Sequence, residues 1–98
     1  MALITLVRPP ANALSHAVRS ELDERLSDAL EADAVRALVL SGAGPGFCAG
    51  AELTELDTAI KPPWVGDLCT RIEDSPKPVV AALHGAVLGA GAELALAA

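Results

Sequence analysis

The chain has 98 residues, which suits one small domain, and its formal net charge is -6. Hydrophobic residues make up 52% of it, too many for a disordered segment, and aromatic residues only 2%, so Ala, Val, Leu and Ile must build the core. The acidic balance argues against a nucleic-acid-binding protein, which needs a basic face to neutralise phosphates.

The first predicted elements are a strand and an amphipathic helix. Residues 3–7 are apolar and β-branched and stop at Pro9, which predicts a strand. Residues 12–15 predict a turn, with Ser15 as the cap of the following helix. Over residues 16–31 the apolar side chains recur at helical spacing, at Val18, Leu22, Leu26 and Ala29/Leu30.

The middle of the chain predicts a strand, a loop and two short helical pieces. Residues 35–40 are almost all apolar, which is typical of a strand that is covered on both faces. Glycines over residues 42–46 predict a loop. Residues 52–56 predict the start of a helix, and residues 66–74 predict one or two helical turns.

The last third predicts another buried strand over residues 79–83, a glycine-spaced loop over residues 85–91 and a helix over residues 92–98. Strands therefore alternate with helices along the chain. This order indicates the α/β class, with a parallel sheet and crossover helices.

The two cysteines, Cys48 and Cys69, lie far apart and form no CxxC pattern. They predict a reduced, cytoplasmic setting rather than a disulfide framework. The start of the chain has no basic residue before its apolar stretch. Its longest apolar run is too short to span a bilayer, so we expect no membrane partner.

Two loops are candidates for chemistry: residues 47–53 and residues 84–93, each between a predicted strand and a predicted helix. Small residues let a backbone approach a ligand closely, and the first N–H groups of a helix lack an intrahelical partner. Two such termini facing each other would stabilise negative charge on an oxygen. Alternatively, the small residues only permit tight packing of strand against helix.

Other glycine-loop sites do not fit. No Gly-Lys-Ser/Thr follows the glycines, as a phosphate-binding P-loop requires. A dinucleotide site would need Gly or Ala at position 94, where the chain has Leu94. There is no Gly-x-Ser-x-Gly elbow and no cluster with metal-ligand spacing. The sequence therefore predicts no metal site.

Glu93 is the only charged residue between Lys77 and the end of the chain. A carboxylate among Leu88, Leu94 and Leu96 would be partly desolvated, and the raised pKa would suit general acid–base catalysis. Alternatively, Glu93 is an ordinary acidic residue in the first turn of a helix, where the dipole favours it.

Structural roles are predicted for the other polar candidates. His84 is interpreted as a strand-end side chain bonded to a turn, and Cys48 as a small core residue. Glu52, Glu55 and Asp57 are interpreted as a solvated helix face.

Three stretches occur in an order that resembles the N-terminal portion of the crotonase (enoyl-CoA hydratase/isomerase) family. They are Ile4-Thr5-Leu6-Val7-Arg8-Pro9-Pro10-Ala11-Asn12-Ala13-Leu14-Ser15, then residues 35–53 ending in Phe47-Cys48-Ala49-Gly50-Ala51-Glu52-Leu53, and residues 76–95 with Gly89-Ala90-Gly91-Ala92-Glu93. The resemblance implies part of the ββα spiral of that family and acyl-CoA substrates that react through a thioester enolate.

The resemblance also implies the roles of particular residues. The backbone N–H groups of Ala51 and Ala90 match the two donors to the thioester oxygen, and Glu93 matches a catalytic Glu of the hydratases. The substrate-binding positions are Ala49, Ala51, Glu52, Leu53, Thr54 and Ala90. Coenzyme A enters as part of the substrate, and no further cofactor is implied.

The sequence departs from the family at several places. Ala90 stands where many members have Gly, and Glu52 replaces the more usual Asp. Residues 53–75 are short for the family, the usual strand before Leu3 is missing, and a second catalytic Glu would fall beyond the chain end. We therefore expect residues 1–98 to be the N-terminal part of a crotonase-like domain, truncated at its C-terminus.

The function expected from the resemblance is hydration of a 2-enoyl-CoA. The alternatives are an enoyl-CoA isomerase or another crotonase-type reaction of a CoA thioester, and a non-catalytic fragment that binds acyl-CoA. Full-length members of the family are typically homotrimers or hexamers, and the resemblance implies the same here.

Overall fold

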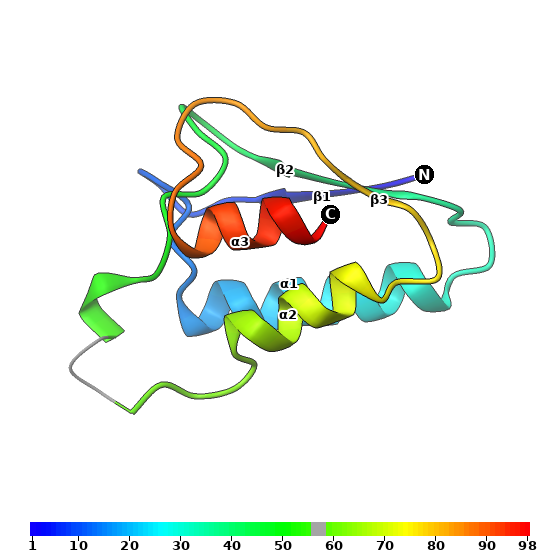
Figure 1. Ribbon diagram of the computed structural model, residues 1–98, viewed down its shortest axis with the longest axis horizontal. Coiled ribbons are helices and arrows are strands. Elements are labelled where there is room, and N and C mark those ends of the chain that lie inside the picture. The colour runs from blue at the N-terminus through cyan, green and yellow to red at the C-terminus, as the bar shows by residue number, and fades with distance from the viewer. Residues whose placement is uncertain (56–58) are drawn as a thin grey trace.

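The computed structural model describes residues 1–55 and 59–98 and has the α/β architecture expected from the sequence (Figure 1). The elements in chain order are β1 (Ala2–Leu6), α1 (His16–Glu31), β2 (Leu38–Gly42), the single 3-10 turn η1 (Leu53–Glu55), α2 (Val65–Glu73), β3 (Val79–Ala81) and α3 (Ala90–Ala97).

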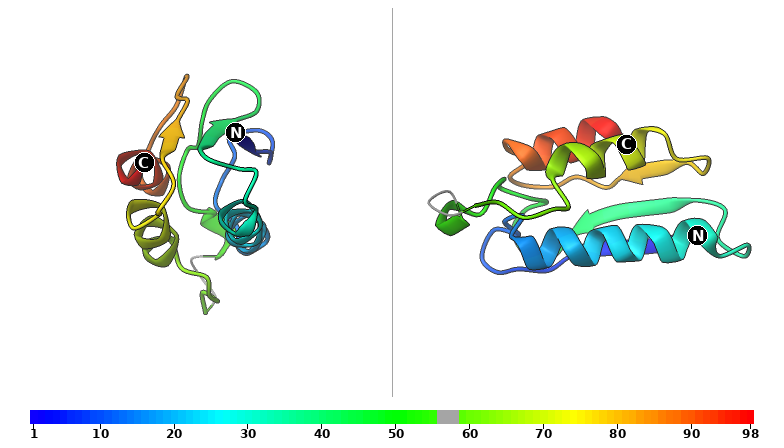
Figure 2. Two further views of the ribbon diagram at one scale, coloured as in Figure 1. Left: turned by 90° about the vertical axis from the view of Figure 1, so that its right-hand side faces the viewer. Right: turned by 90° about the horizontal axis from the view of Figure 1, so that it is seen from below.

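The strands form a parallel sheet in the order β1-β2-β3, with Ile4 opposite Leu40 and Leu40 opposite Ala81. The helices lie together on one side of this sheet (Figures 1 and 2). The other side is open, since Leu3 is 64% exposed and Val80 is 56% exposed. A parallel sheet normally has both faces covered, so this open face is an incomplete layer.

Helix α1 spans the residues that the sequence predicts. Ser15 is its N-cap, and the Ser15 hydroxyl oxygen accepts a hydrogen bond from the Val18 N–H at 3.2 Å. The inward side chains Leu22 and Leu26 are buried against the sheet. Capping and apolar spacing are local signals, and both were present in the sequence.

The predicted strands are shifted or shortened in the structure. Strand β2 begins at Leu38 rather than at residue 35, and it continues through Ser41 and Gly42, which pair with Thr5 and Leu6 of β1. The strand predicted over residues 79–83 is confirmed at Val79–Ala81 (β3), but it ends two residues early, and the prediction that it is buried is wrong, since Val80 is exposed. The pairing partner, rather than local composition, sets these strand ends.

The helical predictions also change at their ends. Helix α3 begins at Ala90, two residues before the predicted start, so Ala90 and Gly91 belong to the helix rather than to the loop. Of the helix predicted over residues 52–56, only the η1 turn forms, and residue 56 lies outside the described residues. Helix α2 covers Val65–Glu73, close to the predicted helical turns.

Polar contacts join the elements around one apolar core. Arg71 of α2 pairs with Asp23 of α1 and donates to the Ser27 hydroxyl at 3.0 Å. The Lys77 ammonium donates to the carbonyls of Ala29 and Ala32 at 2.9 and 2.8 Å, where the end of α1 leaves carbonyls without helical partners. No helix within residues 1–55 and 59–98 has the length and apolar character needed to cross a bilayer.

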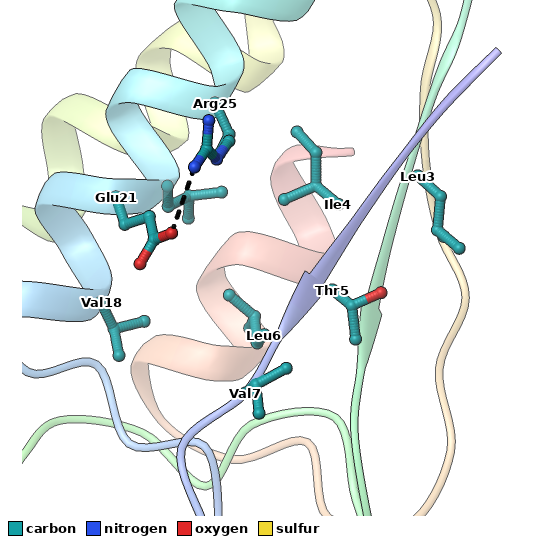
Figure 3. Close-up of a pocket in the computed structure, with 9 residues that line it drawn as sticks. Leu3, Ile4, Thr5, Leu6, Val7, Val18, Glu21 and Arg25 are labelled. Carbon is teal, nitrogen blue, oxygen red and sulfur yellow. Dashed lines mark hydrogen bonds and ion pairs between the residues drawn. The ribbon is translucent and has the colours of Figure 1, made fainter.

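A cavity of about 250 Å³ lies between β1 and α1 (Figure 3). Ile4 and Leu6 stand between the strand and the helix, while Leu3 lies on the other side of the strand. The charged side chains that line it, Glu21 and Arg25, pair with each other at 3.5 Å. The cavity is therefore a gap in the apolar layer rather than a site with free polar groups.

Candidate active site

The two candidate loops are hydrogen-bonded to each other along their backbones. The first loop (residues 43–52) follows β2, and the second loop (residues 82–89) follows β3, so both leave the same edge of the sheet (Figure 1). The Cys48 N–H donates to the Ala86 carbonyl and the Leu88 N–H donates to the Cys48 carbonyl, each at 3.1 Å. Cys48 and Val87 form a parallel bridge between the loops.

Glycine is required where the loops meet. Gly85 has a φ of +59°, and a Cβ at that position would lie 2.0 Å from the Pro45 carbonyl oxygen. A Cβ on Gly91, in the first turn of α3, would lie 2.3 Å from the Cys48 carbonyl oxygen. The interpretation of the small residues as packing residues therefore holds, and the same packing brings the two backbones together.

Ala51 and Ala90, the residues that match the family's oxyanion donors, lie beside each other. A Cβ built on Gly50 would lie 3.7 Å from the Ala90 nitrogen. The Ala51 nitrogen is bonded to the Gly50 carbonyl carbon and so lies within about 4 Å of that Cβ, which leaves the two nitrogens no more than about 8 Å apart.

Both N–H groups are available to a ligand in the part of the chain that the structure describes. There, neither the Ala51 N–H nor the Ala90 N–H donates a hydrogen bond to a protein acceptor. Ala90 is the first residue of α3, where an N–H has no intrahelical partner. Ala51 pairs with Leu14 in a parallel bridge, two residues before η1, so it lies before a 3-10 turn rather than at an α-helix N-terminus.

Glu93 lies in the first turn of α3 and is exposed, so the expected desolvation of its carboxylate is wrong for this chain. Leu94 is turned into the core, whereas Leu96 lies on the exposed side of the helix and Leu88 is exposed in the second loop before it. Burial, and then the Glu93 and Glu73 carboxylates, raise the pKa of the Cys69 thiol on α2. Glu93 therefore lies within electrostatic reach of α2.

A cavity of about 510 Å³ opens between the first loop and the turn that precedes α1. Its lining residues are Arg8, Pro9, Pro10, Ala11, Ala13, Ala49, Ala51, Glu52 and Leu53. Four of the predicted substrate-binding residues are thus brought together in one wall. The other two, Thr54 and Ala90, do not line it.

Glu52 is held by specific partners, so its interpretation as part of a solvated helix face is wrong. The Arg8 guanidinium donates to its carboxylate from Nε at 3.1 Å, and the Thr54 hydroxyl donates to it at 3.2 Å. The hydrogen bond from Arg8, followed by that from the Thr54 N–H, lowers the pKa of Glu52. Both members of the pair line the cavity, so it carries one positive and one negative side chain.

Glu55 is also engaged, against the same expectation. Its carboxylate accepts from the His16 N–H at 2.8 Å and from the Arg19 guanidinium at 3.1 Å. The hydrogen bond from the His16 N–H, and then that from Arg19, lower the pKa of Glu55. Asp57, the third member of the predicted acidic face, lies outside the described residues.

Arg19 is buried, with 4% of its surface exposed, and was not singled out from the sequence. Besides Glu55 it binds three carbonyl oxygens, those of Leu14 at 2.6 Å, Lys61 at 3.1 Å and Pro63 at 2.8 Å. Arg19 therefore links the segment around Lys61 and Pro63 to the start of α1. The only signal in the sequence is that an Arg, which is rarely buried, stands at a position of the helix that faces the core.

Asn12 is a second buried polar residue. The sequence predicts its place in a turn but not its burial or its hydrogen bonds. Asn12 is 2% exposed and has a φ of +55°. Its side-chain NH₂ donates to the carbonyls of Ala43, Gly46 and Phe47, all in the first loop. Its side-chain oxygen accepts from the Arg8 N–H at 2.9 Å.

The predicted bond of His84 to a turn is confirmed, although His84 lies three residues after the end of β3 rather than at the strand end, and the prediction of Cys48 as a core residue is confirmed. His84 Nε2 lies 2.7 Å from the Gly44 carbonyl oxygen, so this ring is bonded to the turn of the first loop. Cys48 is fully buried, and burial raises the pKa of its thiol, which donates to the Asn12 carbonyl. The described residues contain no group of three or more His, Cys, Asp or Glu side chains that could hold a metal ion.

Parallel strands that end in two hydrogen-bonded loops, with the N–H groups of Ala51 and Ala90 not bonded to an acceptor within the described residues, define an α/β protein with two unpaired backbone donors close together. The family model for enoyl-CoA hydratase/isomerase matches residues 1–98, and the chain belongs to that family. The resemblance seen in the sequence is thereby confirmed.

Similar proteins of known sequence support this family membership. The chain is 45% identical over 96 residues to the peroxisomal bifunctional enzyme of Danio rerio, with 98% of the chain and 13% of that protein covered. It is 43% identical over 105 residues to a Bacillus subtilis protein named Probable enoyl-CoA hydratase, with 99% of the chain and 40% of that protein covered.

A solved structure shares the fold. The crystal structure of enoyl-CoA hydratase from Thermoplasma volcanium superposes with a TM-score of 0.86 at 35% identity, covering 99% of this chain and 42% of that one. The chain thus spans less than half the length of each of these three proteins.

Proposed function

We propose that this chain binds an acyl-CoA thioester and supplies both oxyanion donors and one catalytic carboxylate for hydration of a 2-enoyl-CoA. The observation that carries the proposal is the paired loops, which put the Ala90 nitrogen 3.7 Å from the Cβ position of Gly50, the residue bonded to Ala51. Neither N–H is used by an acceptor within the described residues.

The chemistry follows from where charge develops. Water attacks C3 of the enoyl thioester, and the electron pair of the double bond moves to the thioester oxygen. The N–H groups of Ala51 and Ala90 donate to this enolate oxygen, and Glu93 accepts a proton from the attacking water. The second carboxylic acid that the family resemblance implies, beyond residue 98, delivers a proton to C2.

The cavity beside Ala51 supports an assignment for the rest of the substrate. Ala49, Ala51, Glu52 and Leu53 line one side, and the other is the turn over residues 8–13, whose lining side chains are apolar except for Arg8. We assign this cavity, together with Thr54, to the coenzyme A arm. No cofactor besides the coenzyme A of the substrate is required.

Deleting one donor tests the proposal. Ala90 is the first residue of α3, a position where proline is well tolerated because its missing N–H has no helical role. Ala90→Pro therefore removes one oxyanion donor and leaves the helix, and Ala90→Gly is the matched control that keeps the N–H. Loss of one such donor costs about 10²–10³ in kcat.

The measurement uses a chimera, because the chain covers only 42% of the Thermoplasma volcanium enzyme. Residues 1–98 replace the matching stretch of that enzyme, and hydration is followed by loss of the enoyl-thioester absorbance. We expect turnover in the parent chimera, a loss of at least about 10²-fold in Ala90→Pro and little loss in Ala90→Gly. Equal activity of the two variants would contradict the oxyanion role of Ala90.

The same chimera separates the proposal from its alternatives. Hydration yields a 3-hydroxyacyl-CoA, whereas an isomerase moves the double bond and adds no oxygen from water. Acyl-CoA binding without turnover would leave the non-catalytic alternative. A trimeric or hexameric assembly and a cytoplasmic location stay predictions, which sedimentation and localisation of the native protein would test.

A further inference from the structure

We propose that Asn12 is a positioning residue, which sets the direction of the Ala51 N–H through hydrogen bonds that hold the first loop in place. The inference rests on the proposed function for its catalytic consequence, but its geometric part stands on the contacts alone. Asn12 lies in the turn between β1 and α1, behind the loop that carries Ala51.

The side chain of Asn12 is hydrogen-bonded to the first half of the first loop. Its NH₂ group lies 2.8 Å from the Ala43 carbonyl oxygen, 3.0 Å from that of Gly46 and 3.1 Å from that of Phe47. An amide NH₂ has two hydrogens, so three acceptors use its full donor capacity. The contacts to Gly46 and Phe47 are buried and the contact to Ala43 is partly buried, and losing a partner of a buried hydrogen bond leaves a group that water does not reach.

The backbone around Asn12 holds the other end of the loop. The Ala49 N–H donates to the Ala11 carbonyl at 3.0 Å, and the Leu14 N–H donates to the Gly50 carbonyl at 2.8 Å. Residues 8–14 therefore run along the first loop as a strap, with Asn12 at its centre.

One of these bonds fixes the direction of the candidate oxyanion donor. The Gly50 carbonyl and the Ala51 N–H belong to the same planar peptide, and in a trans peptide they point in opposite directions. Because the carbonyl points to Leu14, the Ala51 N–H must point away from the strap. The orientation of this donor therefore depends on where the turn places Leu14.

Asparagine meets two requirements at once. The turn needs a left-handed φ of +55° at this position, which Asn tolerates better than other residues that carry a side chain. It also needs a donor for three carbonyl oxygens. Glycine would supply the conformation without the donor, and aspartate would put a carboxylate against the same oxygens.

These two substitutions form the test, with Leu26→Ala as the control. Asn12→Gly keeps the backbone conformation, and Asn12→Asp keeps the side-chain shape. Leu26 is buried in α1, among the apolar core residues, so truncating it weakens the fold without removing a hydrogen bond to the first loop.

The first readout needs no ligand. Residual dipolar couplings of the chimera report the orientation of the Ala51 N–H relative to that of Ala90. We expect the Ala51 coupling to change in both Asn12 variants and to stay unchanged in Leu26→Ala. An unchanged Ala51 coupling in Asn12→Gly, the variant most compatible with the turn, would overturn the positioning role.

The second readout is the split between kcat and KM. A misaimed oxyanion donor acts in the transition state, so we expect kcat to fall about 10- to 100-fold in both Asn12 variants while KM changes little. Leu26→Ala should keep its kcat below its melting temperature. A changed coupling with an unchanged kcat would overturn the catalytic consequence. A parent chimera without turnover would instead contradict the proposed function, and the couplings would still decide the positioning role.

Discussion

Gly91 and Cys48 are in backbone contact: a Cβ on Gly91 would lie 2.3 Å from the Cys48 carbonyl oxygen and 2.8 Å from the Cys48 Cβ. The same Cys48 carbonyl accepts the Leu88 N–H. The first turn of α3 and the first loop are thus joined where the two candidate donors come together, so their spacing depends on a residue without a side chain.

We expect Gly91→Ala to push these two segments apart. Since the nearest atoms are two backbone atoms and the Cβ of Cys48, none of them the end of a flexible side chain, the added methyl group should lower the free energy of unfolding by about 1–3 kcal/mol. In the chimera it should also lower kcat. Thermal unfolding and hydration rates measure the two effects.

Gly66→Ala is the matched control for this substitution. Gly66 lies in α2, where an added Cβ meets nothing within 4 Å. Alanine is the better helix former, so the free energy of unfolding should be unchanged or rise by up to about 1 kcal/mol. A Gly91→Ala variant as stable and active as Gly66→Ala would show that the loop contact tolerates a methyl group.

Glu93→Gln tests the catalytic carboxylate. The amide keeps the shape of the side chain but cannot accept the proton of the attacking water, so hydration in the chimera should fall by about 10²–10⁴-fold with little change in KM. Glu73→Gln, on α2, removes an exposed carboxylate that also acts on Cys69 and should have little effect. Near-normal turnover of Glu93→Gln would return Glu93 to its role as an ordinary first-turn residue.

Local signals explain what could be predicted from the sequence. Helix α1 was predicted to the residue because its Ser15 cap and its apolar spacing lie within the helix itself. The end of β2 was missed because Ser41 and Gly42 become strand only by pairing with β1. Residues 35–42 alone do not show which strand they will pair with.

The polar contacts around the site depend on the fold in the same way. The three loop acceptors of Asn12 lie 31, 34 and 35 residues away along the chain, and Glu55 lies 36 residues from Arg19. A single sequence indicates a turn at Asn12 and an acidic cluster at Glu55, but not these partners. The family resemblance identified Ala51 and Ala90 without showing what positions them.

Acid should destabilise the chain in part through Glu55. Its pKa is lowered in the folded state, chiefly by the His16 N–H, so Glu55 stabilises the fold above its unfolded pKa of about 4.3 and loses this effect as the pH falls through the lower, folded value. The melting temperature should therefore drop between about pH 6 and pH 3, and less steeply in Glu55→Gln. The exposed Glu24→Gln is the control, and an equally steep drop in Glu55→Gln would contradict the linkage.

The two thiols should differ in reactivity. Cys48 is fully buried and donates to the Asn12 carbonyl, whereas Cys69 is partly exposed on α2. Burial raises the pKa of both thiols, so both should react slowly at neutral pH, but access favours Cys69. Alkylation followed by mass spectrometry should modify Cys69 first. Equal rates at the two sites would mean that the contact between the loops opens readily.

The isolated chain should self-associate through the open side of its sheet. Leu3 and Val80 are 64% and 56% exposed on β1 and β3, the two edge strands, and such apolar edges pair with other chains. Sedimentation velocity should show assembly that increases with concentration. Leu3→Thr and Val80→Thr keep strand propensity and should reduce it, whereas Leu53→Thr, an equally apolar exposed residue off the sheet, should not. A monodisperse monomer with a sharp cooperative melt would contradict this prediction, because it would mean that the open face is stable in water.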